Sequence, residues 1–187
     1  MDVLAVSGYK PHELGIFKQD AKEIHYIKKT IEGKLISFIE EGLTWVVISG
    51  QPGVELWAGE VVSELKREYS HIKLAILAPF YNQEQIWNEH QQEQYQLLLE
   101  EADFVDVISK KEYEGPAQLK AKNDFIITKT DGLLLLYHEE QPGTPSFYLK
   151  AAEIKAAHKE YPIYFITPDD LQQTVEEEDE RLRDYWE

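Results

Sequence analysis

The fold is decided by the stretch Val46-Val47-Ile48-Ser49-Gly50-Gln51-Pro52-Gly53-Val54-Glu55-Leu56-Trp57. Its first three residues are apolar and β-branched, which is typical of a strand that is buried in a parallel sheet. A turn that contains glycine and proline follows, and then the spacing of apolar residues predicts a helix. In a parallel sheet, such a turn brings backbone N–H groups and a helix N-terminus to one edge, an arrangement that binds phosphate.

Glu55 falls in the first turn of the predicted helix, where the helix dipole favours a carboxylate even without a ligand. A tight strand-to-helix turn with a stabilising glutamate is therefore one interpretation. As a ligand contact, a carboxylate would repel phosphates, but it could accept hydrogen bonds from ribose hydroxyls or hold Mg²⁺. Trp57 lies on the apolar face of the same helix, so we expect a core residue first and a ligand contact second.

Strands and helices are predicted to alternate along the whole chain. The apolar runs predict strands over residues 3–6, 45–49, 73–78, 104–108, 132–137 and 163–166. The helical patterns cover residues 20–41, 54–69, 83–102 and 146–160, and another helix starts near Pro116. This alternation predicts a single α/β domain of three layers around a mostly parallel sheet of about six strands. The default strand order of such a sheet is 3-2-1-4-5-6.

We expect the domain to span residues 1–175 and an acidic tail to span residues 176–187. The tail contains the run Glu176-Glu177-Glu178-Asp179-Glu180, and a short helix could start at Pro168. The whole chain of 187 residues has a formal net charge of −16, which opposes non-specific binding of nucleic acid. We therefore expect no nucleic acid among the partners.

Cysteine is absent, so the chain has no disulfide framework, no thiol nucleophile and no thiolate metal site. No apolar run approaches the roughly 20 residues that span a bilayer. The N-terminus enters a strand directly, without a signal segment. These features predict a cytoplasmic protein without a membrane span.

Three turns of the chain offer free N–H groups, a hydroxyl, or both, close to the start of a helix. They are Ser7-Gly8, Ser49-Gly50 through Gly53, and Gly143-Thr144. Ligands of such sheets bind outside the carboxyl ends of the strands, where all three turns are expected. Together they predict an anion site, although glycine after a strand is also common turn chemistry.

Signals for an enzyme are few. The six histidines show no His-x-x-x-His spacing, so a zinc hydrolase is not indicated, and we predict no metal site. The chain lacks a Gly-x-Ser-x-Gly nucleophile elbow and a Gly-x-x-x-x-Gly-Lys-Ser/Thr phosphate loop. No catalytic residue is assigned.

Several motifs occur together in an order typical of a known family. They are Ala5-Val6-Ser7-Gly8-Tyr9-Lys10-Pro11, the stretch 48–57, Tyr113-Glu114-Gly115-Pro116, Lys122-Asn123, Asp131-Gly132-Leu133-Leu134-Leu135-Leu136-Tyr137, and Tyr161-Pro162-Ile163-Tyr164-Phe165-Ile166. From Val3 to about Val175 the sequence resembles the YpsA-type family of the SLOG superfamily. These are Rossmann-like proteins related to DNA-processing protein A and to the LOG nucleotide hydrolases.

The resemblance implies a pocket for a nucleotide or an ADP-ribose-like ligand, with Lys122 placed to meet a phosphate. Together with the turn residues, the predicted ligand-binding set is Ser7, Gly8, Lys10, Gly50, Gly53, Glu55, Trp57, Lys122, Asn123, Gly143 and Thr144. No other cofactor is implied. Family members from Gram-positive bacteria are linked to control of cell division, which implies a regulatory role and a cell-division protein as partner.

The chain departs from the hydrolases of the superfamily at one position. Their Gly-Gly-x-Gly-Thr-x-x-Glu motif ends in a catalytic glutamate, and Phe147 stands at that position here. The acid/base group expected for N-glycosidic hydrolysis is therefore missing. We predict a nucleotide-binding regulatory protein. Two alternatives are a hydrolase or glycosidase that acts on a nucleotide derivative, and a protein-interaction module with a vestigial pocket.

Overall fold

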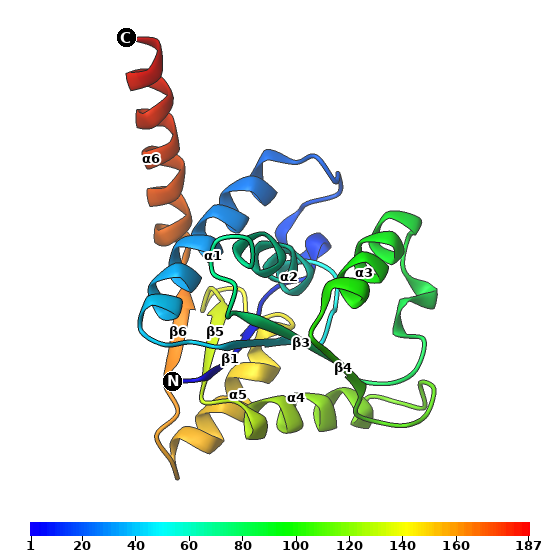
Figure 1. Cartoon of the computed structure of the whole chain (residues 1–187). Helices are drawn as coiled ribbons and strands as arrows, with labels where there is room; N and C mark the ends of the chain where they lie inside the picture. The colour runs from blue at the N-terminus through cyan, green and yellow to red at the C-terminus, as the bar shows by residue number, and fades with distance from the viewer.

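Strands and helices alternate along the chain, and the computed structural model describes all residues from Met1 to Glu187 (Figure 1). The strands are β1 (Val3–Ser7), β2 (Trp45–Ile48), β3 (Lys73–Ala78), β4 (Phe104–Val107), β5 (Gly132–Leu136) and β6 (Ile163–Ile166). The α-helices are α1 (Lys22–Glu40), α2 (Val54–Leu65), α3 (Glu89–Glu101), α4 (Ala117–Lys129), α5 (Pro145–Ala156) and α6 (Pro168–Trp186). Two short 3-10 helices, η1 (Pro11–Leu14) and η2 (Gln83–Ile86), complete the set.

The six strands form one sheet in the order β4-β3-β2-β1-β5-β6, and every pair of neighbours is parallel. The expected α/β class and the six-stranded parallel sheet are confirmed. The default order 3-2-1-4-5-6 is wrong for this chain, because β4 pairs with β3 and the chain returns to β1 only with β5. Because the crossovers are right-handed, connections whose helices lie on one face add strands toward one edge of the sheet. Connections whose helices lie on the other face add strands toward the opposite edge.

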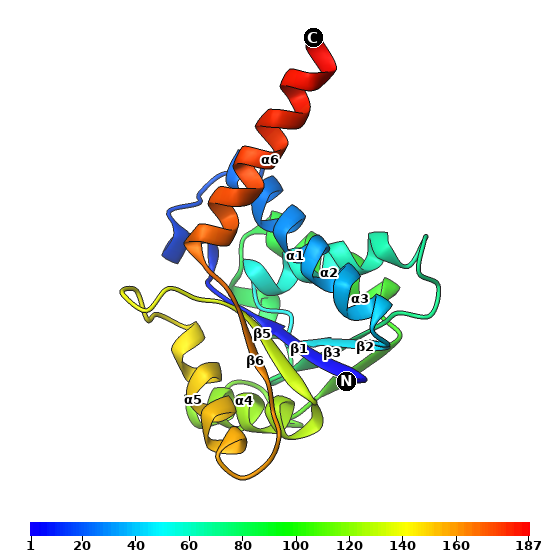
Figure 2. The ribbon, with the colours of Figure 1, turned by 90° about the vertical axis from the view of Figure 1, so that its left-hand side faces the viewer.

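The sheet separates two helical layers. Helices α1, α2 and α3 cover one face, and α4 and α5 cover the other (Figure 2). Each face has its own buried apolar cluster: Leu4, Val6 and Ile48 belong to the larger cluster below α1 and α2, whereas Leu133 and Leu135 belong to the smaller one below α4 and α5. Apolar side chains thus lie on both faces of the sheet, and helices cover each face, which gives the Rossmann-like arrangement of three layers.

The predicted helix over residues 83–102 is divided in two. η2 ends at Ile86, and α3 starts after Asn88, whose side chain accepts a hydrogen bond from the backbone N–H of Gln91 at 2.9 Å. Asparagine is a preferred N-cap residue for this reason. Asn88 is a possible N-cap in the sequence, but the apolar spacing that predicts the helix does not mark a helix start there.

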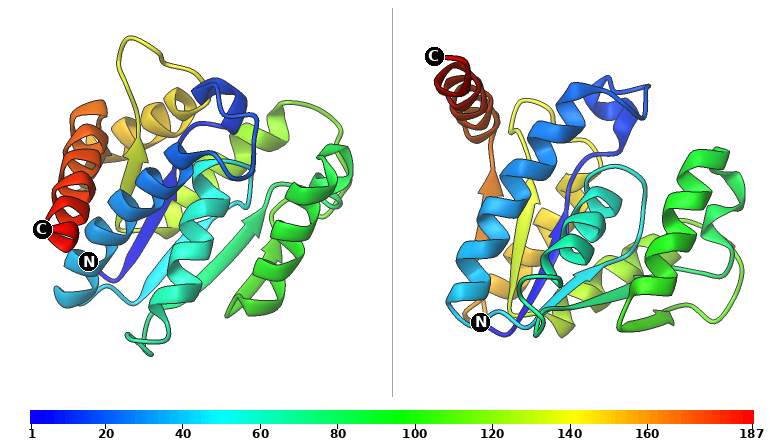
Figure 3. Two further views of the ribbon diagram at one scale, coloured as in Figure 1. Left: turned by 90° about the horizontal axis from the view of Figure 1, so that it is seen from above. Right: turned by 45° about the horizontal axis from the view of Figure 1, so that its top comes forward.

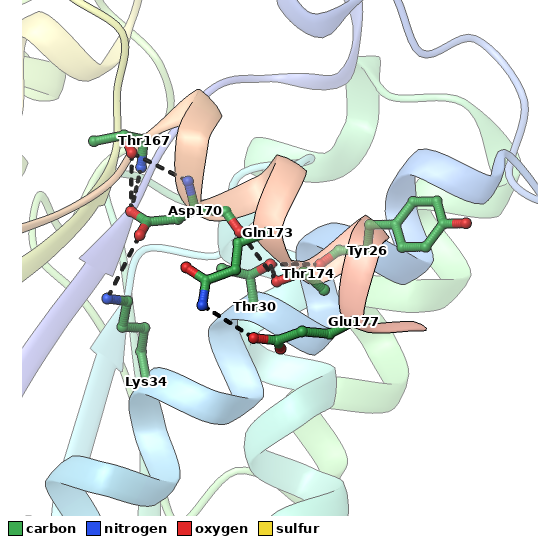
Figure 4. Close-up of polar contacts among 8 residues, drawn as sticks. All are labelled: Tyr26, Thr30, Lys34, Thr167, Asp170, Gln173, Thr174 and Glu177. Atoms are coloured by element: carbon green, nitrogen blue, oxygen red, sulfur yellow. Dashed lines mark hydrogen bonds and ion pairs between the residues drawn. The ribbon is translucent and has the colours of Figure 1, made fainter. Parts of the chain in front are cut away.

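The acidic C-terminal segment is helical and continuous with α6, so the expected boundary between residues 175 and 176 falls inside a helix. α6 packs antiparallel to α1 through polar contacts, which Figure 4 shows: the hydroxyls of Thr30 and Thr174 lie 2.7 Å apart, and Asp170 pairs with Lys34 at 4.0 Å. Beyond this contact the helix projects away from the domain (Figure 3). Its last aromatic side chains, including Trp186, are exposed.

None of these helices combines the length and the apolar character that crossing a bilayer would require.

The turn between β2 and α2 depends on glycine at position 53. Gly53 has a φ of +95°, and a Cβ added there would lie 2.4 Å from the backbone oxygen of Tyr9. The neighbouring Val54 N–H donates to the same oxygen at 3.1 Å. The start of α2 is therefore held against the turn after β1 by a contact that admits no side chain.

We predict that Gly53→Ala lowers the free energy of unfolding by more than about 2 kcal/mol, because it combines a strained φ with a backbone clash. Gly33 is the matched control: it lies in α1, and an added Cβ meets no atom within 4 Å. Gly33→Ala should stabilise by about 0.5 to 1 kcal/mol. Urea unfolding followed by circular dichroism measures both changes. Equal stability of the two variants would contradict this account of the turn.

Candidate functional site

The carboxylate of Glu55 lies at the carboxyl ends of β1 and β2 and has no exposed surface. One oxygen, Oε1, accepts hydrogen bonds from the Ser49 N–H at 2.6 Å, the Ser49 hydroxyl at 2.8 Å and the Gly50 N–H at 3.2 Å. The other, Oε2, accepts from the Ser7 hydroxyl at 2.9 Å. Both oxygens are therefore used inside the protein. These hydrogen bonds join α2 to the ends of two strands.

The first two predicted turns pack directly against each other. A Cβ on Gly8 would lie 2.8 Å from the side chain of Val54, and one on Gly50 would lie 2.6 Å from the ring of Tyr95. These glycines allow close packing between the turns and their neighbours. Ser7, Gly8, Gly50 and Gly53 are thus brought together as predicted, but their small size serves the contact between elements.

The third turn is covered by another carboxylate. Glu13, on η1, accepts hydrogen bonds from the Lys10 N–H at 2.9 Å and from the Thr144 N–H at 2.8 Å. A Cβ on Gly143 would lie 2.4 Å from Oε2 of Glu13. We call this group, the Lys10 and Thr144 N–H donors with Gly143, the Gly143 cradle. It lies at the N-terminus of α5, where the dipole favours an anion. The hydrogen bonds from Lys10 and Thr144 outweigh the effect of burial and hold the pKa of Glu13 below its ordinary value.

Lys122 is the buried cation of the site, with only 4% of its surface exposed. Its Nζ donates to the hydroxyl of Tyr148 at 3.2 Å and lies 4.5 Å from the centre of that ring. No carboxylate lies within the 4.0 Å of an ion pair. Burial lowers the pKa of Lys122 to about 8, against the charge of Glu55, which raises it, while Lys10 lowers it further.

Asn123 follows Lys122 on α4 and is also buried, with 8% of its surface exposed. Its Oδ1 has no hydrogen-bond partner. Buried polar atoms normally have a partner, so this unpaired oxygen, next in sequence to a buried cation without an ion pair, requires an explanation. The two predicted residues therefore lie in the interior as a pair whose polar groups are not fully satisfied by the protein. Such an arrangement can bind an anion that also accepts or donates hydrogen bonds.

Trp57 is separated from this group. It is 5% exposed, belongs to the core cluster and lines, together with Gly53, a cavity of about 1170 Å³ between residues 11–28, α2 and α3. Neither Lys122 nor Glu55 lines this cavity. We place the candidate site at Lys122 rather than in this cavity, because Lys122 is a buried charge without an ion pair.

Phe147 lies on α5 with 65% of its surface exposed. The position that would carry a catalytic glutamate therefore holds an apolar ring in contact with solvent. No group of three or more His, Cys, Asp or Glu side chains is arranged to hold a metal ion.

Two residues of the site were missed in the sequence. Glu13 had a weak signal, because it lies three residues after Lys10, with Pro11 between them. This spacing is typical of a capping box at a helix start. Tyr148 had none, because it and Lys122 lie on different helices and are 26 positions apart in the sequence. Contacts between distant elements cannot be read from local spacing.

Comparison with known proteins identifies the family. The model of the YpsA family, described as the YspA SLOG family, matches residues 4–171. The chain belongs to this family. UPF0398 protein YpsA of Bacillus subtilis is 53% identical over 178 residues, which cover 95% of this chain and 99% of that protein. UPF0398 protein BH1768 of Halalkalibacterium halodurans is 50% identical over 179 residues, 96% of this chain and 95% of the relative.

A solved structure has a similar fold at low sequence identity. DNA processing protein A from Helicobacter pylori, described for its binding of single-stranded DNA, superposes with a TM-score of 0.53 at 13% identity. The match covers 88% of this chain and 64% of that one, so the present chain spans less than two thirds of the neighbour's length. This likeness supports the SLOG-type fold.

The network around Glu55 makes a testable prediction for this YpsA-family protein. Glu55→Ala should lower the free energy of unfolding by more than about 3 kcal/mol, because it leaves several buried donors unpaired. Glu55→Gln should cost only about 1 kcal/mol, since the Ser7 hydroxyl can rotate to accept from the new amide. Glu64 on the same helix is exposed, so Glu64→Ala should change stability by less than about 0.5 kcal/mol. Denaturant unfolding of the three variants measures these losses of unfolding free energy. Equal losses for Glu55→Ala and Glu64→Ala would refute the prediction.

Proposed function

We propose that this protein binds a small phosphate-bearing ligand of the nucleotide or ADP-ribose type at the carboxyl edge of the sheet and acts as a regulatory protein. The observation that carries the proposal is the buried ammonium of Lys122, which has one neutral hydrogen-bond partner and no paired carboxylate. A phosphate beside it would supply the missing negative charge and the missing acceptors.

The pKa of Lys122 shows that its burial costs stability. Its value of about 8 lies below the ordinary value of 10.5, so the folded protein binds the proton less tightly than the unfolded chain. Below pH 8 this difference costs about 3 kcal/mol of stability, and the cost is relieved as the pH rises from 8 to 10.5. A feature that weakens the fold at neutral pH is best explained by a role in binding.

The surroundings of Lys122 favour a small ligand. Its partner Tyr148 lies one helical turn after Thr144, whose N–H belongs to the Gly143 cradle. The hydrogen-bond partner of Lys122 and the cradle are therefore both at the start of α5. The net charge of −16 opposes a long polyanion, whereas a small anion can be held by local donors. This charge is the reason to prefer a nucleotide-like ligand over nucleic acid.

A regulatory role is favoured over catalysis by the exposed Phe147, which replaces the acid/base residue of the hydrolases. In this proposal, occupancy of the site is passed to a protein partner. The resemblance to the family suggests that the partner belongs to the cell-division machinery.

The test is a thermal-stability panel of ATP, NAD, ADP-ribose, AMP and cyclic dinucleotides. A ligand at about 100 times its dissociation constant should stabilise the protein by roughly 2.7 kcal/mol, or a few degrees. Lys122→Met should abolish the shift and raise the stability of the free protein at pH 7. Lys120→Met is the matched control, since it removes an exposed cation from the same helix. Absence of any shift, or equal shifts in both variants, would refute the proposal.

A further inference from the structure

We propose that Glu13 is an internal competitor that occupies the phosphate position of the binding site, so that a ligand must displace its carboxylate from the Gly143 cradle. This inference rests on the proposed function and adds how the site is regulated. It starts from one contact: both oxygens of Glu13 accept backbone hydrogen bonds, from Lys10 at 2.9 Å and Thr144 at 2.8 Å.

The cradle is shaped for an anionic oxygen. Gly143 has a φ of +50°, and a Cβ there would lie 2.4 Å from Oε2 of Glu13 and 3.2 Å from the ring of Tyr9. The position left free by the missing side chain is therefore filled by a carboxylate oxygen. Carboxylate and phosphate oxygens accept backbone N–H groups in the same way, so the carboxylate is in the position that a phosphate would take.

A second, independent observation indicates an anionic ligand here. Lys122 is buried without an acidic partner, and Tyr148, the residue to which it donates, lies on the first turns of the helix that starts at the cradle. Lys10, which donates its N–H to Glu13, is near enough to Lys122 to lower the pKa of its ammonium. Glu13 accepts hydrogen bonds from both donors of the cradle, but it forms no ion pair with Lys122. A phosphate-bearing ligand could do both.

The position of Glu13 allows exchange. It lies on the four-residue helix η1, which is followed by Gly15 with a φ of +69°. The cradle is accessible because Gly143 is exposed. Besides the two carboxylate contacts, η1 is tied to the loop over residues 138–144 by a hydrogen bond from the Gln141 side chain to the Glu13 carbonyl at 2.6 Å. Replacement of one anion by another keeps the number of hydrogen bonds to the cradle constant. η1 can therefore move without breaking the sheet or the Glu55 network.

Two variants of Glu13 test the competition. Glu13→Gln removes the charge and replaces one oxygen by an amide N–H₂, which cannot accept, so at most one of the Lys10 and Thr144 N–H groups keeps its acceptor. Glu13→Asp keeps the charge but is one methylene too short to reach both donors. Glu139→Gln is the control, because it removes one exposed carboxylate from the loop that leads to the cradle and makes no hydrogen bond to it. Pyrophosphate and ADP-ribose serve as the probes, and titration calorimetry measures their dissociation constants.

We expect both Glu13 variants to bind the probes about tenfold more tightly than the wild type, as removal of a competing state requires, and the control to bind like the wild type. Equal affinity of wild type and both Glu13 variants would overturn the competition and leave the proposed ligand site intact. Weaker binding by the Glu13 variants would also overturn it, since Glu13 would then organise the site. Absence of binding by every form, the Glu13 variants included, would overturn both this inference and the proposed function.

Discussion

The Glu55 carboxylate is the interaction on which the carboxyl edge of the sheet depends. It accepts four hydrogen bonds while fully buried, from the ends of β1 and β2, and so fixes where α2 begins. The contact of Gly53 with the Tyr9 carbonyl and the close approach of Gly8 to Val54 lie at this same start of α2. A charged hydrogen-bond acceptor of this kind is stable in the interior only when its oxygens are satisfied.

Two carboxylates accept hydrogen bonds from backbone N–H groups near the starts of helices. They are Glu55 beside α2 and Glu13 beside α5. The first is fully buried, whereas the second is only partly buried and lies on the four-residue helix η1. Lys122 is left as the buried charge without a charged partner. The distribution of paired and unpaired charges therefore separates the residues that hold the fold from those available to a ligand.

Much of this architecture could be predicted from the sequence, because buried strands and amphipathic helices have local patterns. The ends of β3 and β6 agree with the apolar runs, and the glycine turns at Ser7-Gly8 and Gly53 lie at the expected edge. The strand order and the roles of the acidic residues could not be predicted. Whether Glu55 faces a ligand or a pair of serines depends on how β1 and α2 pack, and local spacing contains no information about that.

Direct measurement of the Lys122 pKa tests the central claim of this account. Nuclear magnetic resonance titration of labelled lysine side chains, assigned with Lys122→Met, reports the value in the free protein and with ADP-ribose bound. We expect a pKa near 8 in the free protein and a rise toward the ordinary value when the phosphates are bound. A value near that of an exposed lysine in the free protein, or no change on binding, would contradict it.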